Sequence, residues 1–271
     1  MTYSLVIPFR GYAGWAFLAR TQETQRAAFA ASASVQTTEQ YFRDNISKIE
    51  TAEQLVADRR LLDVALNAFG LGEDINNRFF IQKVLEEGTL KEESFANRLS
   101  DKRYLALSKA FGFGDSATPQ TKLAQFTDGI IAAYRDRKFE VAVGDIDENM
   151  RVALSLQREL PALAAQESSV NTKWFSIIGS PPLSRAFQTA LGLPSTVGAL
   201  DIDQQVGIFK DKAEAMFGSA DPTQFRNPET IDKLVKSFLL RSELSVSATG
   251  SGSSVALQIL QANQGRLGLR L

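Results

Sequence analysis

The stretch Leu55–Gly72 spaces its apolar side chains as an α-helix does and then reaches a glycine. An i, i+3, i+4, i+7 pattern puts one apolar stripe on a helix, and the stripe here is Leu62, Ala65, Leu66 and Phe69. Gly70 can adopt the left-handed conformation that ends a helix without a Cβ penalty. A polar loop follows, and then a second stripe at Phe80, Val84 and Leu85. The stretch therefore predicts a helix, a terminating glycine, a loop and a second helix.

The same pattern occurs again in Ser100–Gly114 and in Pro182–Pro194, where AFGFG and ALGLP correspond to the AFGLG of the first stretch. A second apolar stripe follows each glycine: Leu123, Phe126, Ile130 and Tyr134, and then Val206, Phe209, Ala213 and Phe217. The interval from the second glycine to the third is close to twice the first, so a degenerate unit near residue 150 would make the spacing regular. Chance recurrence of a common helix ending is the alternative. We expect an all-α fold of repeated helix–glycine–helix hairpins, packed into a compact or elongated helical domain.

Changes in composition divide the chain into four segments. Residues 1–37 are expected to form an N-terminal segment and helix, and residues 38–143 the first two hairpins. Residues 144–244 hold a long helix and the third hairpin, and residues 245–271 a Gly/Ser linker with a C-terminal helix. The length also allows residues 38–244 to form one domain.

Apolar spacing and capping residues predict further helices at Gly11–Ser34, Thr89–Leu99, Glu148–Glu167 and Asn171–Ile178. Residues 35–38 are expected to break the first of these. Pro161 is expected to kink or restart the third, because proline lacks the N–H that the helix needs. No segment shows convincing strand alternation.

The chain contains no histidine and no cysteine. Disulfides, thiolate or histidine metal sites and Ser–His–acid triads are therefore excluded, and the most common general base is missing. A net charge of −1 provides no basic field for nucleic acid. No apolar run is long enough to span a bilayer, and no cleavable signal peptide is apparent. We expect a protein that is not an enzyme, has no cofactor and no metal, and by default resides in the cytoplasm.

The spacing that opens a calcium-binding loop occurs at Asp145, Asp147 and Asn149. Such a loop needs a turn glycine and a bidentate glutamate where this chain has Met150 and Leu156. These acidic residues are therefore expected to begin a helix.

Two kinds of charged cluster remain as candidates for chemistry. The pairs Glu86-Glu87 and Glu92-Glu93 are expected to be solvated helix ends, since nothing marks their surroundings as low in dielectric. Arg59-Arg60 and Lys102-Arg103 could hold a phosphate, but an aspartate precedes each pair. Helix starts and surface ion pairs are the expected result.

The two ends of the chain are apolar helical pieces next to weakly structured sequence. Such helices either dock on the body of the protein or bind in a groove of a partner. The candidate partner-binding residues are Val255, Leu257, Ile259 and Leu260 near the C-terminus, and Trp15 and Leu18 near the N-terminus.

Several of these stretches together resemble a known family. They are Tyr41-Phe42, Asn45-Ile46, residues 55–62, Ala65-Leu66, residues 68–71, 79–81, 84–88, 96–99 and 101–104, and residues 190–193. The chain resembles the alphaproteobacterial domain-of-unknown-function proteins that are commonly encoded among flagellar genes. The family supplies no catalytic residues.

The resemblance implies a non-enzymatic helical protein that acts through protein–protein interaction, as an assembly or structural accessory of the bacterial flagellum. A cytoplasmic chaperone for an exported flagellar component is an alternative, and a histidine-free enzyme with a carboxylate site is another. The expected partners are proteins, flagellar components among them, and the location is the cytoplasm or the flagellum. The sequence leaves open whether the protein forms a homo-oligomer.

Overall fold

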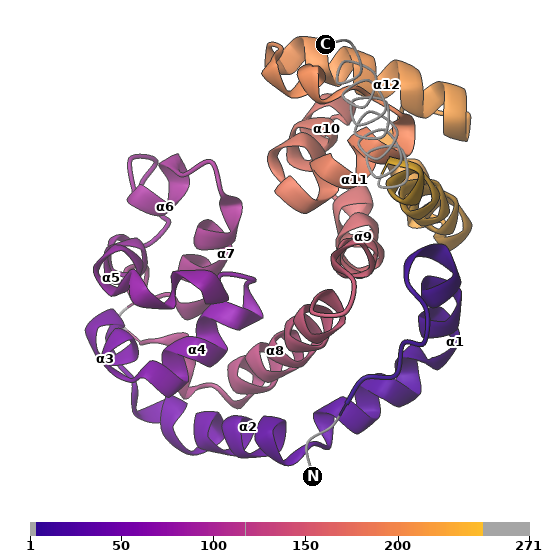
Figure 1. The fold of residues 1–271 in the computed structure, drawn as a ribbon. Helices are drawn as coiled ribbons and strands as arrows, with labels where there is room; N and C mark the ends of the chain where they lie inside the picture. Colours follow the sequence, from indigo (N-terminus) through magenta and orange to yellow (C-terminus); the bar gives the residue numbers. More distant parts are fainter. Residues whose placement is uncertain (1–3, 117, 246–271) are drawn as a thin grey trace, which may run out of the picture. The chain divides into compact units, whose positions relative to one another are not determined.

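The computed structural model describes residues 4–116 and 118–245, and this part of the chain consists of helices without any strand (Figure 1). The prediction of an all-α fold is confirmed. The chain forms two compact units. Unit 1 comprises the residues up to Pro8 together with Ala16–Ile146, and unit 2 comprises Phe9–Trp15 and the residues from Asp147 onward. The expected N-terminal segment, residues 1–37, is thus shared between the two units.

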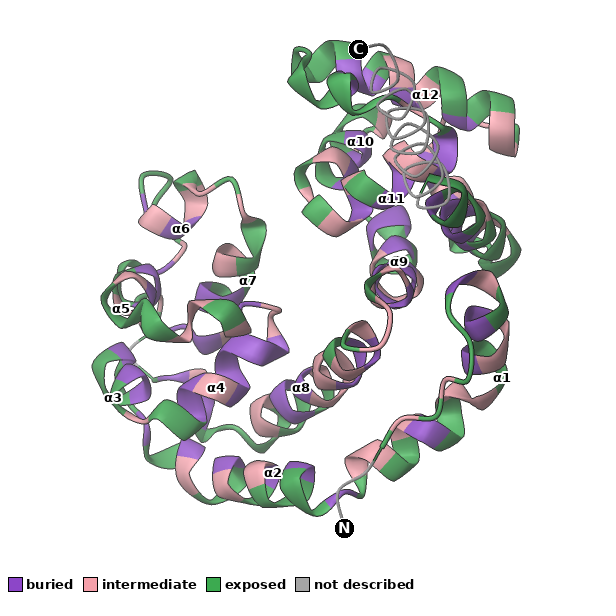
Figure 2. Ribbon diagram, in the orientation of Figure 1, coloured by how far each residue is buried: buried purple, intermediate pink, exposed green. Residues whose placement is uncertain are grey.

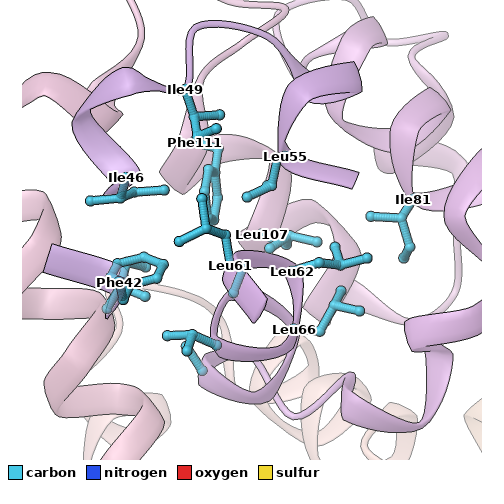
Figure 3. Close-up of a cluster of buried hydrophobic side chains, with 14 of the residues drawn as sticks. Phe42, Ile46, Ile49, Leu55, Leu61, Leu62, Leu66, Ile81, Leu107 and Phe111 are labelled. Atoms are coloured by element: carbon cyan, nitrogen blue, oxygen red, sulfur yellow. The ribbon is translucent and has the colours of Figure 1, made fainter. Parts of the chain in front are cut away.

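Unit 1 is organised around helix α4 (Arg59–Ala68), which packs against α2 (Ala33–Asn45) and α8 (Ala124–Gly144). Most of α4 is buried, as the purple ribbon in Figure 2 shows. In Figure 3 its leucines lie in one cluster with side chains of α2 and α7, including Phe42 and Phe111. The unit also contains α1 (Gly11–Ala30) from Ala16 onward, η1 (Ile46–Lys48), α3 (Ala52–Ala57), α5 (Arg78–Glu87), α6 (Phe95–Arg98), α7 (Lys102–Phe111) and two further 3₁₀ helices.

The stretch that predicted one helix forms two, because the chain is extended at Asp58 (φ −91°, ψ 101°). The Asp58 carboxylate accepts hydrogen bonds from the N–H groups of Arg60 at 2.9 Å and Leu61 at 3.1 Å. A side chain that caps the next helix in this way competes with continuation of the previous one. The break allows Leu55 and Val56 to be buried as part of the separate helix α3.

The predicted helix ends are confirmed, since three glycines have left-handed φ angles: Gly70 (+73°), Gly112 (+66°) and Gly192 (+67°). After α4, the N–H of Leu71 donates to the carbonyl of Leu66 at 2.8 Å, and Gly70 donates to Asn67 at 3.0 Å. This pair of bonds satisfies carbonyls that would otherwise lack partners. The same pair ends α11 (Pro181–Leu191), whereas α7 ends with a single bond from Gly112.

A short 3₁₀ helix follows each of these glycines, where the sequence predicted only a loop. A fourth connection of this kind, at Gly218, joins α12 (Ile202–Phe217) to a last helix over residues 228–245. The 3₁₀ helices are η2 (Gly72–Asn76), η3 (Gln120–Lys122), η4 (Ser195–Ala199) and η5 (Pro222–Arg226). The unit expected near residue 150 is absent, because α9 (Glu148–Ala165) runs through that position, and the additional unit lies at Gly218 instead.

The glycine connections do not all bring their two helices together. In the third, α11 packs directly against α12. In the first, α4 has its main contacts with α8 and α2, while α5 packs against α3 and α7. The repeated local pattern therefore serves different packing partners in different parts of the chain.

Unit 2 has an aromatic core around Trp174, which is fully buried on α10 (Val170–Gly179). Its ring centroid lies 5.6 Å from that of Phe187 and 6.0 Å from that of Phe209, both with edge-to-face geometry. Phe225 of η5 extends the core at 5.2 Å from Phe187. Helix α9 packs against α11 and η5 and continues through Pro161 to Ala165 without restarting.

Two predicted boundaries are wrong. Helix α1 ends at Ala30 and α2 begins at Ala33, so the break lies at residues 31–32 and not at 35–38. The predicted helix Thr89–Leu99 is reduced to α6. The N–H of Thr89 donates at 2.5 Å to Asp115, a distant partner that replaces helical hydrogen bonding at this point.

Candidate functional site

An open apolar groove of about 340 Å³ lies on unit 1, where α7, η3 and the start of α8 meet. Its lining residues are Ala110, Gln120, Leu123, Gln125, Phe126, Gly129 and Ile130. Leu123, the residue before α8, is 51% exposed, although the sequence places it on the apolar stripe predicted for this helix. An exposed leucine beside further apolar surface is a feature of binding sites for apolar side chains.

The groove exists because the apolar stripe of α8 extends beyond the core. Ile130 is buried, but Phe126 is only partly covered, and its ring rests edge-on against Phe111 at 5.0 Å. Gly129 lies three residues after Phe126, and a Cβ at Gly129 would meet no atom within 4 Å. A helix glycine with no side chain thus leaves the hollow open. The sequence does show a glycine on an apolar helix face. Whether that glycine lines a groove could not be predicted, because it depends on which elements cover the face.

The chemistry of the groove is that of binding. Its lining residues are all among those that the structure describes, and none of them carries an ionisable side chain. Gln120 and Gln125 provide the polar groups that can orient a bound segment. The arrangement suits an apolar side chain or helix face and offers no acid, base or nucleophile.

The N-terminal partner-binding candidates are core residues. Trp15 is 5% exposed and Leu18 is fully buried. Trp15 belongs to unit 2 and Leu18 to unit 1, and the burial of each side chain means that neither offers a free surface. The C-terminal candidates, Val255, Leu257, Ile259 and Leu260, lie outside the described residues.

Of the calcium-like acidic residues, Asp147 begins a helix, as predicted, whereas Asp145 lies at the C-terminal end of α8. Asp147 is the N-cap of α9, and its Oδ1 accepts from Asn149 N–H at 2.9 Å and Met150 N–H at 3.4 Å. Its second carboxylate oxygen accepts from the backbone of Gly11 at 3.0 Å. Across the described ranges, no group of three or more histidine, cysteine, aspartate or glutamate residues could hold a metal ion.

The aspartate–arginine clusters are helix starts. Asp58 accepts from the hydroxyl of Tyr41 at 2.7 Å, and the guanidinium of Arg60 lies 3.6 Å from the centre of the Tyr41 ring. Asp101 caps α7 and forms a surface ion pair with Arg103, as predicted. Arg103 also donates to the carbonyl of Gly70, so its charge stabilises the C-terminal end of α4.

The carboxylate pair near the end of α5 is engaged in ordinary surface contacts. Glu86 accepts from Gln82 at 2.7 Å, and Glu87 lies 3.8 Å from Lys83. Glu87 also accepts from the N–H of Phe95 at 2.7 Å, which ties it to the start of α6. Glu92 and Glu93 are exposed in the segment before that helix.

Two tyrosines are held in their protonated form. Burial, with a smaller contribution from the nearby Asp63, raises the pKa of Tyr134 to about 12. Burial and the hydrogen bond to Asp74 also raise the pKa of Tyr104. Both phenols therefore act as packing groups or hydrogen-bond donors and are poorly suited to be bases.

Within the part of the chain that the structure covers, helices with the length and apolarity of a membrane span do not occur.

A family model described as a protein of unknown function, DUF1217, matches residues 68–231, which is more than half of the chain. The chain belongs to the DUF1217 family. The expected membership of an uncharacterised family is thus confirmed. The DUF1217 match includes the three predicted glycine connections and every residue that lines the groove.

The DUF1217 chain is similar in fold to a crystal structure of protein AGR_C_984 from Agrobacterium tumefaciens. The two share 24% sequence identity and a TM-score of 0.71, over 87% of this chain and 94% of the other. At this identity the likeness concerns the fold alone. No curated protein matches the DUF1217 chain.

Proposed function

We propose that this protein works by binding a helical or extended segment of another protein in the groove of unit 1. The observation that carries the proposal is the open, apolar and uncharged lining, in which Leu123 stays exposed next to Phe126 and Gly129. An apolar groove of this kind is a common way to receive one face of an amphipathic helix.

We propose further that the role is that of a non-enzymatic accessory in the assembly or structure of the bacterial flagellum. This part rests on the family resemblance of the sequence. The alternative of a cytoplasmic chaperone for an exported flagellar component fits the same groove, since both roles need a peptide-binding surface.

A carboxylate enzyme has less support. Among the described residues, the buried carboxylates are Glu39 and Glu140. Glu39 is paired with Arg135, and Glu140 lies 3.9 Å from Arg137. Both buried carboxylates are therefore engaged with arginine side chains.

The test is to fill the groove by one substitution. Gly129→Leu adds a side chain at its open floor, and Gly207→Leu is the matched control, because Gly207 lies in the middle of α12, where a Cβ also meets no atom within 4 Å. Protein with an internal affinity tag is used to capture partners from the native organism, and binding is then repeated with each purified partner. We expect Gly129→Leu to lose a partner that the wild type and Gly207→Leu retain. Equal retention of every partner by all three proteins would refute the proposal that the groove is the binding site.

The identity and location of the captured partner test the flagellar role separately. A structural accessory should copurify with flagellar basal bodies, whereas a chaperone should remain in the soluble fraction with its exported client. A groove-dependent partner that is not a flagellar component would remove the flagellar assignment and leave the binding function in place.

A further inference from the structure

The last helix of unit 2 exposes two leucines near the end of its described part. Its first half exposes charged residues, Asp232, Lys233 and Lys236. Its second half exposes Arg241 and Glu243, and between and beside them Leu240, at 39%, and Leu244, at 68%. The two leucines are four residues apart, so they lie on one face of the helix, within two turns of residue 245, where the described part of the chain ends.

The start of α1 lies beside this part of the helix. The N–H of Tyr12 donates to Glu243 at 2.7 Å, and the ammonium group of Lys236 lies 5.5 Å from the centre of the Tyr12 ring. Lys236, Leu240 and Glu243 share one helix face, because they are four and three residues apart. Phe9, three residues before Tyr12, is 60% exposed. We call Leu240 and Leu244 the terminal patch.

We propose that the terminal patch is the docking site of this chain's own segment Val255–Leu260. The segment supplies four apolar side chains, Val255, Leu257, Ile259 and Leu260. Residues 246–254 separate it from the last described turn of the helix, and their sequence, VSATGSGSS, is that of a Gly/Ser linker.

The short linker favours this segment over a separate partner as the occupant of the terminal patch. Nine residues of such composition have a root-mean-square span of about 15–18 Å, which keeps the segment within reach of Leu244. A short linker of this kind gives an effective concentration of about 1 mM. An apolar contact with a dissociation constant of about 0.1 mM would then be closed roughly ten times more often than open. A partner in solution at micromolar concentration would need far higher affinity to compete. This inference concerns unit 2 alone and does not depend on the groove of unit 1.

Amide hydrogen exchange of residues 255–260 in the full chain tests the proposal. We expect exchange in the wild type to be slowed about tenfold relative to the intrinsic rate, by the same factor at every protein concentration. Leu240→Gln/Leu244→Gln should abolish the protection, because it removes the apolar contact while glutamine remains a good helix former. Phe79→Gln/Leu90→Gln is the matched control, since it replaces two exposed apolar residues of unit 1.

Three results would overturn the proposal. Exchange of residues 255–260 at the intrinsic rate in the wild type would show that nothing covers them. Protection that disappears on dilution would identify a second copy of the chain as the occupant. Protection that survives Leu240→Gln/Leu244→Gln would place the segment elsewhere.

Discussion

Asp147 Oδ2 accepts a hydrogen bond from the backbone N–H of Gly11 at 3.0 Å, across 136 positions of sequence. The other oxygen of the same carboxylate caps α9 through Asn149. One aspartate therefore satisfies unpaired N–H groups at the starts of two helices, α1 and α9.

Asp147→Ala should lower the free energy of unfolding by about 1–2 kcal/mol, at the upper end for a lost helix cap, because it leaves N–H groups of two helices without an acceptor. Asp201→Ala is the control, since Asp201 caps only α12 through the N–H of Asp203 at 3.0 Å. Urea denaturation measures both. Equal losses in the two variants would mean that the bond to Gly11 contributes nothing.

Gly114→Ala should destabilise the protein strongly, because the backbone of Gly88 lies against it. A Cβ at Gly114 would lie 2.7 Å from the Cα of Gly88, and one at Gly88 would lie 2.8 Å from the carbonyl carbon of Gly114. Neither neighbour is a flexible side-chain end, so the chain itself must move. We expect a loss of about 1–3 kcal/mol, as for overpacked cores.

Gly207→Ala is the same glycine-to-alanine change, but here we expect the free energy of unfolding to rise. In an open position within a helix, alanine should stabilise by about 0.5–1 kcal/mol through helix propensity. In thermal unfolding, Gly207→Ala should raise the melting temperature and Gly114→Ala should lower it. A melting temperature for Gly114→Ala at or above that of the wild type would contradict the close backbone contact.

Glu39→Gln should lower stability by about 1–2 kcal/mol, because a hydrogen-bonded charge on a buried side chain is lost. Glu39 on α2 is paired with Arg135 on α8, which is itself partly exposed. Asp128→Asn removes a second α2–α8 pair, with Arg43 at 2.6 Å, but both of those side chains are exposed. Its effect should be about 0–1 kcal/mol. Chemical denaturation of the two variants at low and high salt compares the pairs directly.

Ionisation of Tyr134 should lower the free energy of unfolding in alkaline solution. Its pKa is raised from 10.0 in the unfolded chain to about 12 in the fold, mainly by burial. The neutral phenol is therefore favoured by folding, and its contribution is full below pH 10 and is lost as the pH rises through about 12. Tyr134→Phe cannot ionise and should show a shallower decline of unfolding free energy between pH 9.5 and about 11.5 than the wild type. Identical slopes would contradict the raised pKa.

The sequence predicted best those features that depend on neighbouring residues. The apolar stripe of α4 and the left-handed glycines at 70, 112 and 192 follow from local spacing and from backbone sterics, and the structure contains all of them. The break at Asp58 was missed because a capping aspartate and a charged first-turn residue look alike in sequence.

Features that depend on distant residues were not predictable in this way. The segment after Thr89 is held by Asp115, and the exposure of Leu123 depends on where α7 and η3 end. Trp15 is buried in unit 2, and apart from Phe9–Trp15 all of that unit follows Ile146 in the sequence. The candidate groove could therefore be recognised only after the fold was known.

The division of the chain at Phe9–Trp15 sets an order for folding during synthesis. Every described residue of unit 1 emerges from the ribosome before Asp147, so that unit can form while the chain is still short. The start of α1 is made among the first residues, yet its partners Asp147 and Glu243 are among the later ones. The first turn of α1 must therefore wait, with Trp15 uncovered, until nearly the whole described chain has been translated.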